Sequence, residues 1–299
     1  MSSKTRAKAR SARKTNFYVA CLNIVLHPHS RDKYISLLRA INELKLDAKV
    51  RGDDALMIGS FYEIVESRGE AFSGSIYKFL KLDAAEDWFN TLKNDAASRE
   101  DIKDINIPDH LKPHFKKFQY VFFPKNHRLY FICKKGSDTL SPNMLKLFFD
   151  RIASASELAQ FGELSVTVQP EEGITEQFFS IERVSLIELE IHKPNPDDHE
   201  DLEEEIMERL KSLNAGKEKR TYVEATNTGL QPDNMLKALA AVAAENGGVY
   251  VKGRHDGKVV ELNSRERPLK SAHSYNGDLQ TELYALLEKA EQLHREITG

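Results

Sequence analysis

The pattern of apolar and polar residues predicts alternating strands and helices from residue 16 onward. Residues 17–26 form a nearly continuous apolar run, which is typical of a strand buried on both faces. Pro28 ends this run, and Ser30 is placed to cap a helix whose apolar positions recur at helical spacing. We therefore predict, in order, a helix over 31–45 and strands over 55–65 and 74–82.

The middle of the chain predicts a surface excursion followed by a hairpin. Residues 93–106 are rich in Asp, Lys and Ser, which favours an exposed segment. Residues 118–123 and 128–133 are aromatic-rich strand candidates, joined by a Pro-Lys-Asn-His turn. Ser141-Pro142 predicts a helix start, because proline suits the first helical position.

The second half continues as strand, helix, strand and helix, and then a hairpin. The Asp256-Gly257 step favours a tight turn between two strands. The predicted elements are strands over 163–168, 185–191, 221–225, 248–252 and 258–262, and helices over 197–213, 233–244 and 278–297. This order predicts an α+β protein with mixed sheets, helices on one face and two αβ sandwich-like halves.

We expect three regions along the chain. Residues 1–15 are predicted to be a disordered basic arm, and residues 16–160 an N-terminal α+β domain. Residues 161–299 are predicted to be a C-terminal α+β domain with a basic hairpin and a closing helix that could serve docking or dimerisation.

Composition excludes several classes of protein. The 299 residues are 40% apolar and 30% charged, which are ordinary globular values. Membrane-length apolar stretches and a signal peptide are absent, so we expect a cytoplasmic protein without membrane insertion. Cys21 and Cys133 lie in strand-like runs and are predicted to be buried thiols, not a disulfide or zinc site. Phosphate-binding, dinucleotide, nucleophile-elbow and kinase signatures are also absent, and no cofactor is predicted.

Positive charge is concentrated at the N-terminus. Residues 1–14 contain no acidic residue, and subtracting their basic charges from the net charge of −3 leaves −9 on the remainder. Such an arm can neutralise DNA phosphates, although a disordered solubilising tail is the alternative. The basic residues of the arm are Lys4, Arg6, Lys8, Arg10, Arg13 and Lys14.

A second basic group lies in the last third of the chain, around the Asp256-Gly257 turn. A twisted hairpin with cationic edges can follow a phosphate backbone, whereas Glu261 and Glu266 dilute the charge. The candidate DNA-binding residues here are Lys217, Lys219, Arg220, Lys252, Arg254, Lys258, Arg265, Arg267 and Lys270.

Catalytic alternatives rest on two short segments. His27 and His29 could bind a metal or act as acid and base, whereas a polar turn before a capped helix is the structural alternative. Asp53 and Asp54 could hold a divalent ion in a nuclease, whereas an ordinary turn explains them better. The corresponding function is a metal-dependent nuclease or toxin hydrolase.

A third interpretation concerns the acidic run at the start of the helix predicted over 197–213. Carboxylates are favoured near a helix N-terminus by the helix dipole. Their density could also form a docking surface for a basic protein effector, with a solvated helix face as the alternative.

Five short phrases, kept in order, resemble an uncharacterised bacterial domain-of-unknown-function family met among prophage and mobile-element genes. They are FYVACLNIVLHPHS (17–30), VRGD (50–53), INIPDHLKP (105–113), KPNPDD (193–198) and AAENG (243–247). The order of elements is also similar to that of the phage-lambda exclusion protein Rex A. That resemblance implies a DNA-binding dimer in phage defence.

Together these observations predict a non-enzymatic, dimeric protein that binds double-stranded DNA without sequence specificity in anti-phage defence or phage exclusion. The nuclease or toxin hydrolase and the regulatory protein-docking scaffold remain the alternatives.

Overall fold

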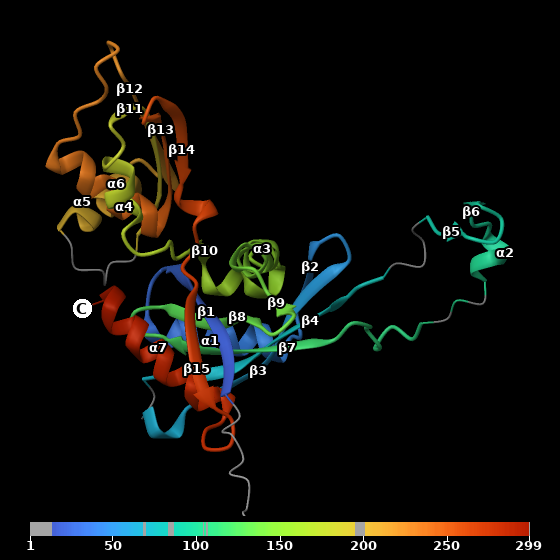
Figure 1. Ribbon diagram of the computed structural model, residues 1–299. Helices are drawn as coiled ribbons and strands as arrows, with labels where there is room; N and C mark the ends of the chain where they lie inside the picture. Colours follow the sequence, from blue (N-terminus) through green and yellow to red (C-terminus); the bar gives the residue numbers. More distant parts are fainter. Residues whose placement is uncertain are drawn as a thin grey trace, which may run out of the picture.

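The computed structural model describes residues 14–67, 70–82, 87–103, 105, 107–194 and 201–298. It confirms an α+β fold, in which the larger sheet has nine antiparallel strands with the main order β10-β1-β8-β7-β4-β3-β2 (Figure 1). Strand β15 also pairs with β1, and β9 pairs with β8. The strands are β1 (Lys14–His27), β2 (Asp47–Arg51), β3 (Asp54–Glu63), β4 (Phe72–Leu80), β7 (Lys116–Phe123), β8 (Arg128–Lys135), β9 (Asp138–Thr139), β10 (Glu163–Val168) and β15 (Ser271–Asn276).

Helices cover both faces of the larger sheet, because alternate residues of a strand point to opposite sides. Leu22 and Ile24 of β1 pack with helices α1 (Arg31–Glu43) and α3 (Pro142–Ile152). Val19 and Cys21 point the other way, toward helix α7 (Glu282–Thr298). The continuous apolar run in β1 therefore reflects burial on both faces, as the sequence predicts.

The smaller sheet has the order β12-β11-β13-β14, and the described helices cover one of its faces. Helices α4, α5 and α6 pack on the apolar side chains of β11 and β13 (Figure 1). The opposite face carries mostly polar and charged side chains, with Val223 and Val259 exposed among them. The elements are α4 (Ile174–Phe179), β11 (Arg183–His192), α5 (Asp201–Ser212), β12 (Lys217–Val223), α6 (Asn234–Asn246), β13 (Gly247–His255) and β14 (Lys258–Asn263).

The end of the chain returns to the larger sheet. Strand β15 pairs with the first part of β1, from Lys14 opposite Asn276 to Val19 opposite Ser271, and α7 packs on the same sheet. Strand β10, early in the second half, also pairs with β1. The larger sheet therefore contains strands from both sides of residue 160, the expected domain boundary. Pairing between strands distant in sequence leaves no local pattern from which it could be predicted.

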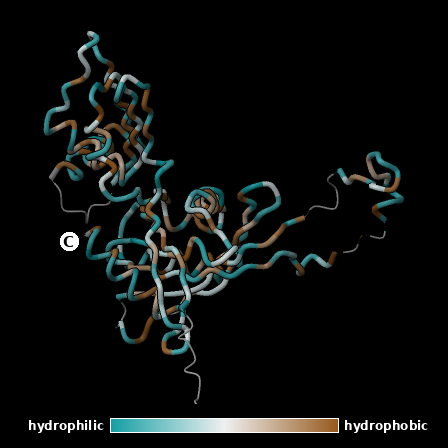
Figure 2. The backbone as a smooth tube through the Cα atoms, viewed as in Figure 1, coloured by the Kyte–Doolittle hydropathy of each residue, from teal (hydrophilic) through white to brown (hydrophobic). Residues whose placement is uncertain are grey.

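A long excursion connects β4 to β7 and extends away from the rest of the molecule (Figure 1). It contains β5 (Phe89–Asn90), β6 (Asp95–Ala96) and the short helix α2 (Arg99–Ile102). None of its described residues between 81 and 115 is buried. Figure 2 shows that apolar residues are nevertheless present along it.

Local predictions agree with the structure at several turns and caps. The Ser30 and Ser141 side chains accept hydrogen bonds from helix backbone N–H groups. Asp256 and Gly257 both have positive φ angles, +51° and +71°, as a tight hairpin turn between β13 and β14 requires. Cys21 and Cys133 are buried free thiols, and burial raises the pKa of Cys21 to about 12. The remaining elements are short 3₁₀ turns at Val65–Ser67, Ser156–Phe161 and Ser264–Glu266.

The predicted basic arm lies almost entirely outside the described residues. Lys4, Arg6, Lys8, Arg10 and Arg13 belong to the undescribed part, so their expected role is not addressed by the structure. Lys14 was expected to be disordered, but it begins β1 and lies opposite Asn276 of β15 in the sheet.

Candidate nucleic-acid interface

The open face of the smaller sheet gathers cations around one carboxylate. Ile187, Leu189 and Ile191 of β11 face the helices, so Glu188 and Glu190 face the open side. The Glu190 carboxylate lies 2.9 Å from the Lys219 Nζ, 3.4 Å from the Lys217 Nζ and 3.0 Å from an Arg265 Nη. Two basic residues of β12 and one that follows β14 thus meet at one carboxylate.

Glu190 is held in its ionised form by this arrangement. Partial burial by itself would raise the pKa of Glu190, but hydrogen bonds from Lys219 and His192 and the charge of Arg265 lower it well below its usual range. His192 Nε2 lies 3.0 Å from the same carboxylate. With Glu190 ionised and Glu188 exposed on the same face, the three basic side chains still leave one net positive charge.

Arg265 reaches this cluster because residue 248 is a glycine. A Cβ atom at Gly248 would lie 2.4 Å from Arg265 Nε. Arg265 therefore crosses β13 directly over Gly248, and its Nε donates to the Gly247 carbonyl at 3.2 Å. Close approach of a side chain to the backbone is one of the conditions in which glycine is needed. The position of Arg265 is thus set by the backbone of β13.

Two cavities open beside the cluster and share Glu190 and Arg265. The first, of about 470 Å³, lies on the sheet face and includes Tyr250 and Asn263. The second, of about 450 Å³, lies between the two sheets and brings in Lys146 of α3, His192 and Lys193, which the sequence analysis did not single out. One sequence pattern could have revealed this site. The alternation Ser-Leu-Ile-Glu-Leu-Glu-Ile-His in β11 places Glu188 and Glu190 on one face of the strand.

The other predicted basic residues of the last third do not join this cluster. Arg220 points to the helix-covered side and pairs with Glu218 at 2.7 Å. Arg267 pairs with Glu171 at 3.1 Å. Lys252 is on the open face, but it pairs with Glu261 at 2.8 Å. The predicted set is therefore divided between surfaces.

Three further predicted residues are exposed. Arg254 lies near the tip of the β13–β14 hairpin on the open face, whereas Lys258 lies opposite His255 on the same side of β14 as Val260 and Leu262, the helix-covered side. Lys270 lies beside Tyr18 and Lys134 on the larger sheet, away from the smaller one.

The predicted catalytic residues are not brought together. Asp53 and Asp54 lie at the β2–β3 turn and form ion pairs with Lys49 at 2.9 Å and Lys78 at 3.0 Å. His27 and His29 lie at the end of β1, which is separated from β3 by strands β8, β7 and β4. Across the part of the chain that the structure describes, no group of three or more metal-binding side chains occurs. The two segments therefore do not form one metal site.

His27 instead lines the second cavity, together with Lys193 and Arg265. Its Nε2 atom is buried and has no hydrogen-bond partner among the described residues. Burial lowers the pKa of His27, which favours its neutral form. One residue of the catalytic hypothesis thus borders the cationic cluster.

His29 belongs to a separate, more deeply buried group. Its Nδ1 lies 2.9 Å from the Tyr34 hydroxyl, and its ring meets the His127 ring edge-on at a centroid distance of 5.7 Å. Burial, followed by the charges of Arg128 and nearby histidines, lowers the pKa of His127 well below its usual range. The fully buried His127 is therefore neutral.

A chain of hydrogen bonds fixes the tautomer of His127. The Asn246 amide donates to a Glu203 carboxylate oxygen at 2.8 Å, and its own oxygen accepts from Asn23 at 3.3 Å. The Asn23 oxygen must then accept from His127 Nδ1–H, at 2.8 Å. His127 Nε2 is consequently an unprotonated, buried acceptor without a hydrogen-bond partner among the described groups.

This chain changes the interpretation of the acidic helix. Glu203 of α5 is only 6% exposed and bonds Asn246, so it is part of the interior instead of a docking surface. Glu204, Glu205 and Glu208 are exposed on the same helix and remain available to a partner. Residues 197–200 of the predicted acidic run lie outside the described part of the chain.

Comparison with known proteins identifies the family but no relative of established function. Among the helices that the structure describes, none combines the length and apolar character that crossing a membrane needs. A search of curated proteins finds no match. The model of the family described as a domain of unknown function, DUF4747, matches residues 15–291, and the chain belongs to this family.

Proposed function

We propose that this protein binds double-stranded DNA without sequence specificity, through the open face of its smaller sheet, in anti-phage defence or phage exclusion. The observation that carries the proposal is the convergence of Lys217, Lys219 and Arg265 on the single carboxylate of Glu190. A surplus of fixed positive charge beside polar cavities is what phosphate contacts need. The order of elements similar to that of Rex A is the ground for the role in phage exclusion.

The geometry favours backbone contacts over base reading. Lys217 and Lys219 alternate along β12, so both side chains lie on the open face, and each is half exposed or more. Lys252 and Arg254 lie on the same face along β13, on the other side of β11, where Lys252 pairs with Glu261. Flexible lysines on a sheet present point charges to phosphates and do not specify a base.

Binding of a labelled DNA duplex to the full chain, measured by fluorescence anisotropy between about 50 and 200 mM salt, tests the proposal. We expect affinity to fall steeply with salt. The triple variant Lys217→Gln, Lys219→Gln, Arg265→Gln should reduce the slope of log affinity against log salt by roughly 2 to 3, because three phosphate contacts are lost.

A matched control removes the same charge elsewhere. Lys117, Lys125 and Lys211 are exposed and lie away from the open face, so changing all three to Gln should leave the slope unchanged. Equal losses in both triple variants would show that only net charge matters, and would reject the assigned surface. The expected homodimer is tested on the same samples by sedimentation velocity.

The hydrolase alternative is favoured by one observation, the buried neutral His127 beside His29. Including magnesium in the DNA assay separates the two functions. Magnesium-dependent cleavage that is lost in His29→Ala would replace the binding proposal with a nuclease. Intact DNA with a steep salt dependence would favour the binding protein.

A further inference from the structure

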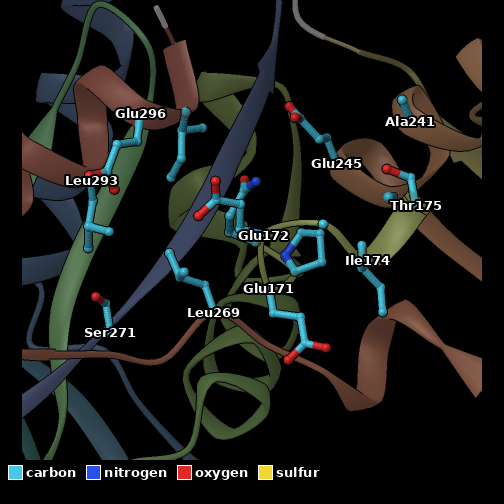
Figure 3. A pocket seen from close by; sticks show the side chains of 15 residues that line it. Glu171, Glu172, Ile174, Thr175, Ala241, Glu245, Leu269, Ser271, Leu293 and Glu296 are labelled. Atoms are coloured by element: carbon cyan, nitrogen blue, oxygen red, sulfur yellow. The ribbon is translucent and has the colours of Figure 1, made fainter. Parts of the chain in front are cut away.

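A third cavity, of about 260 Å³, lies between α6, which covers the smaller sheet, and α7, which covers the larger one (Figure 3). The segment that leads from β10 to α4 and the segment that precedes β15 complete its walls. It shares no lining residue with the two cavities beside Glu190. It is therefore a separate site from the DNA-binding surface proposed above.

The charge of this cavity is negative. The carboxylates of Glu171, Glu172, Glu245 and Glu296 line it, and no basic residue does (Figure 3). Arg267 pairs with Glu171 and Arg128 pairs with Glu245, both from outside the lining. Glu172 is exposed and has no ion-pair partner among the described residues, so its charge is available to a ligand.

An amide side chain also lines this cavity. Gln169 lines the cavity and is only 7% exposed. Its oxygen accepts from an Arg128 Nη at 2.9 Å, which leaves the amide NH₂ of Gln169 as the free end. This NH₂ has no hydrogen-bond partner among the described groups and is not one of the buried atoms that lack a partner, so it is open to the cavity. A ligand acceptor would satisfy it.

The remaining walls are apolar. Ile174 and Leu293 are almost completely buried and line the cavity together with Leu269 (Figure 3). Apolar walls with a few convergent polar groups are typical of sites for small molecules. The volume limits the occupant to a small one.

We propose that this cavity binds an unphosphorylated amino-substituted heterocycle, of the nucleobase or nucleoside kind. The exocyclic amino group donates to the free carboxylate of Glu172, a ring acceptor takes the N–H of Gln169, and the ring packs on the apolar walls. A phosphorylated ligand is disfavoured by the surrounding carboxylates. An alkyl amine would satisfy the carboxylates but not the Gln169 donor.

Isothermal titration of the full chain with cytidine, adenosine and guanosine tests this inference, with each 5′-monophosphate and spermidine as comparisons. We expect at least one nucleoside to bind, with its monophosphate about tenfold weaker or more because the carboxylates repel phosphate. Ala241 is exposed and lines the cavity, so Ala241→Phe should fill it and abolish binding without disturbing the core. Glu172→Gln should weaken binding by several-fold.

Matched controls separate this site from the DNA-binding surface. Glu176→Gln removes an exposed carboxylate of α4 outside the cavity and should not affect nucleoside binding. The Lys217, Lys219 and Arg265 triple variant should also bind nucleoside normally, and Ala241→Phe should bind DNA normally. The inference is overturned if no nucleoside binds at about 1 mM, if both cavity variants bind normally, or if spermidine or the monophosphates bind more tightly.

Discussion

His127 and Gly248 show how single residues set properties of this protein. His127 is buried and neutral, and its Nδ1–H is held by Asn23. Its positive φ of 47° suits asparagine better than most other residues. His294, whose pKa burial lowers to about 4, stacks on Phe123 nearby. Both histidines resist protonation in the folded protein.

Lowering the pH from about 7 to 5 should therefore destabilise the fold. The unfolded state takes up a proton at each histidine below a pKa of about 6.5, whereas folded His127 does not, so the free energy of unfolding falls by about 1.4 kcal/mol per pH unit for this residue. His127→Asn should reduce the difference between urea unfolding at the two pH values. The exposed His255→Asn is the control, and an equal effect in both variants would contradict the assignment.

Gly248→Ala should weaken DNA binding without adding or removing charge. The new Cβ would lie 2.4 Å from Arg265 Nε and displace the guanidinium from Glu190. We expect the salt slope of DNA binding to fall by about 1, as on loss of one phosphate contact. In an Arg265→Gln background the glycine substitution should have no further effect, because the two changes act on one group. If the effects of the two substitutions on DNA binding were fully additive, Gly248 would act on binding through a group other than Arg265.

Among the elements, the excursion between β4 and β7 contrasts with α7. The excursion has no buried residue in its described part, whereas Ala285, Leu286 and Ala290 of α7 are fully buried against the larger sheet. The two ends of the excursion meet, because the Leu80 N–H donates to the Pro113 carbonyl at 2.9 Å. Burial of apolar surface is the main stabilising contribution to folding. Of these two segments, only α7 therefore contributes substantially to stability.

Replacing residues 83–112 with a short Gly-Ser linker should leave the free energy of unfolding within about 1 kcal/mol of the original, because surface loops tolerate such changes. Leu286→Ala in α7 should instead cost about 2 to 5 kcal/mol. Urea unfolding followed by circular dichroism measures both. A large loss on removing the excursion would show that it packs against another part of the protein.

For the whole molecule, the junction between the two sheets depends on Arg128. This residue of β8 is 2% exposed on its side chain and donates to Gln169, after β10, and to Glu245, near the end of α6. Asn23 of β1 and Asn246 of α6 bond across the same junction. Hydrogen bonds between polar groups thus join the two sheets. Each buried donor at this junction needs its acceptor, and each acceptor its donor.

Arg128→Met should lower the free energy of unfolding by about 3 kcal/mol, because it leaves the buried Gln169 oxygen and the partly exposed Glu245 carboxylate without this donor. Arg209, which is exposed and lies 3.7 Å from Glu218, is the matched control. Arg209→Met should cost less than about 1 kcal/mol, since exposed ion pairs contribute little. Similar costs for both arginines would show that the junction does not depend on Arg128.

The sequence by itself determined the elements whose signals are local. Apolar spacing and caps predicted the helices after Ser30 and Ser141, and the Asp256-Gly257 step predicted its hairpin turn. These signals act over a few residues, so one chain segment is enough to reveal them. The basic character of the last third of the chain could also be read from the sequence, because it depends on composition alone.

Only the tertiary structure decided which residues meet. Strand β15 pairs with β1 from the other end of the chain, and Lys217, Lys219 and Arg265 converge on Glu190, while Arg220 turns away. The hydrogen bonds of His127 carried no sequence signal, because its partner Asn23, and Asn246 to which Asn23 donates, come from distant parts of the chain. Such contacts depend on which faces of the sheets and helices bury one another, and that packing is a property of the whole chain.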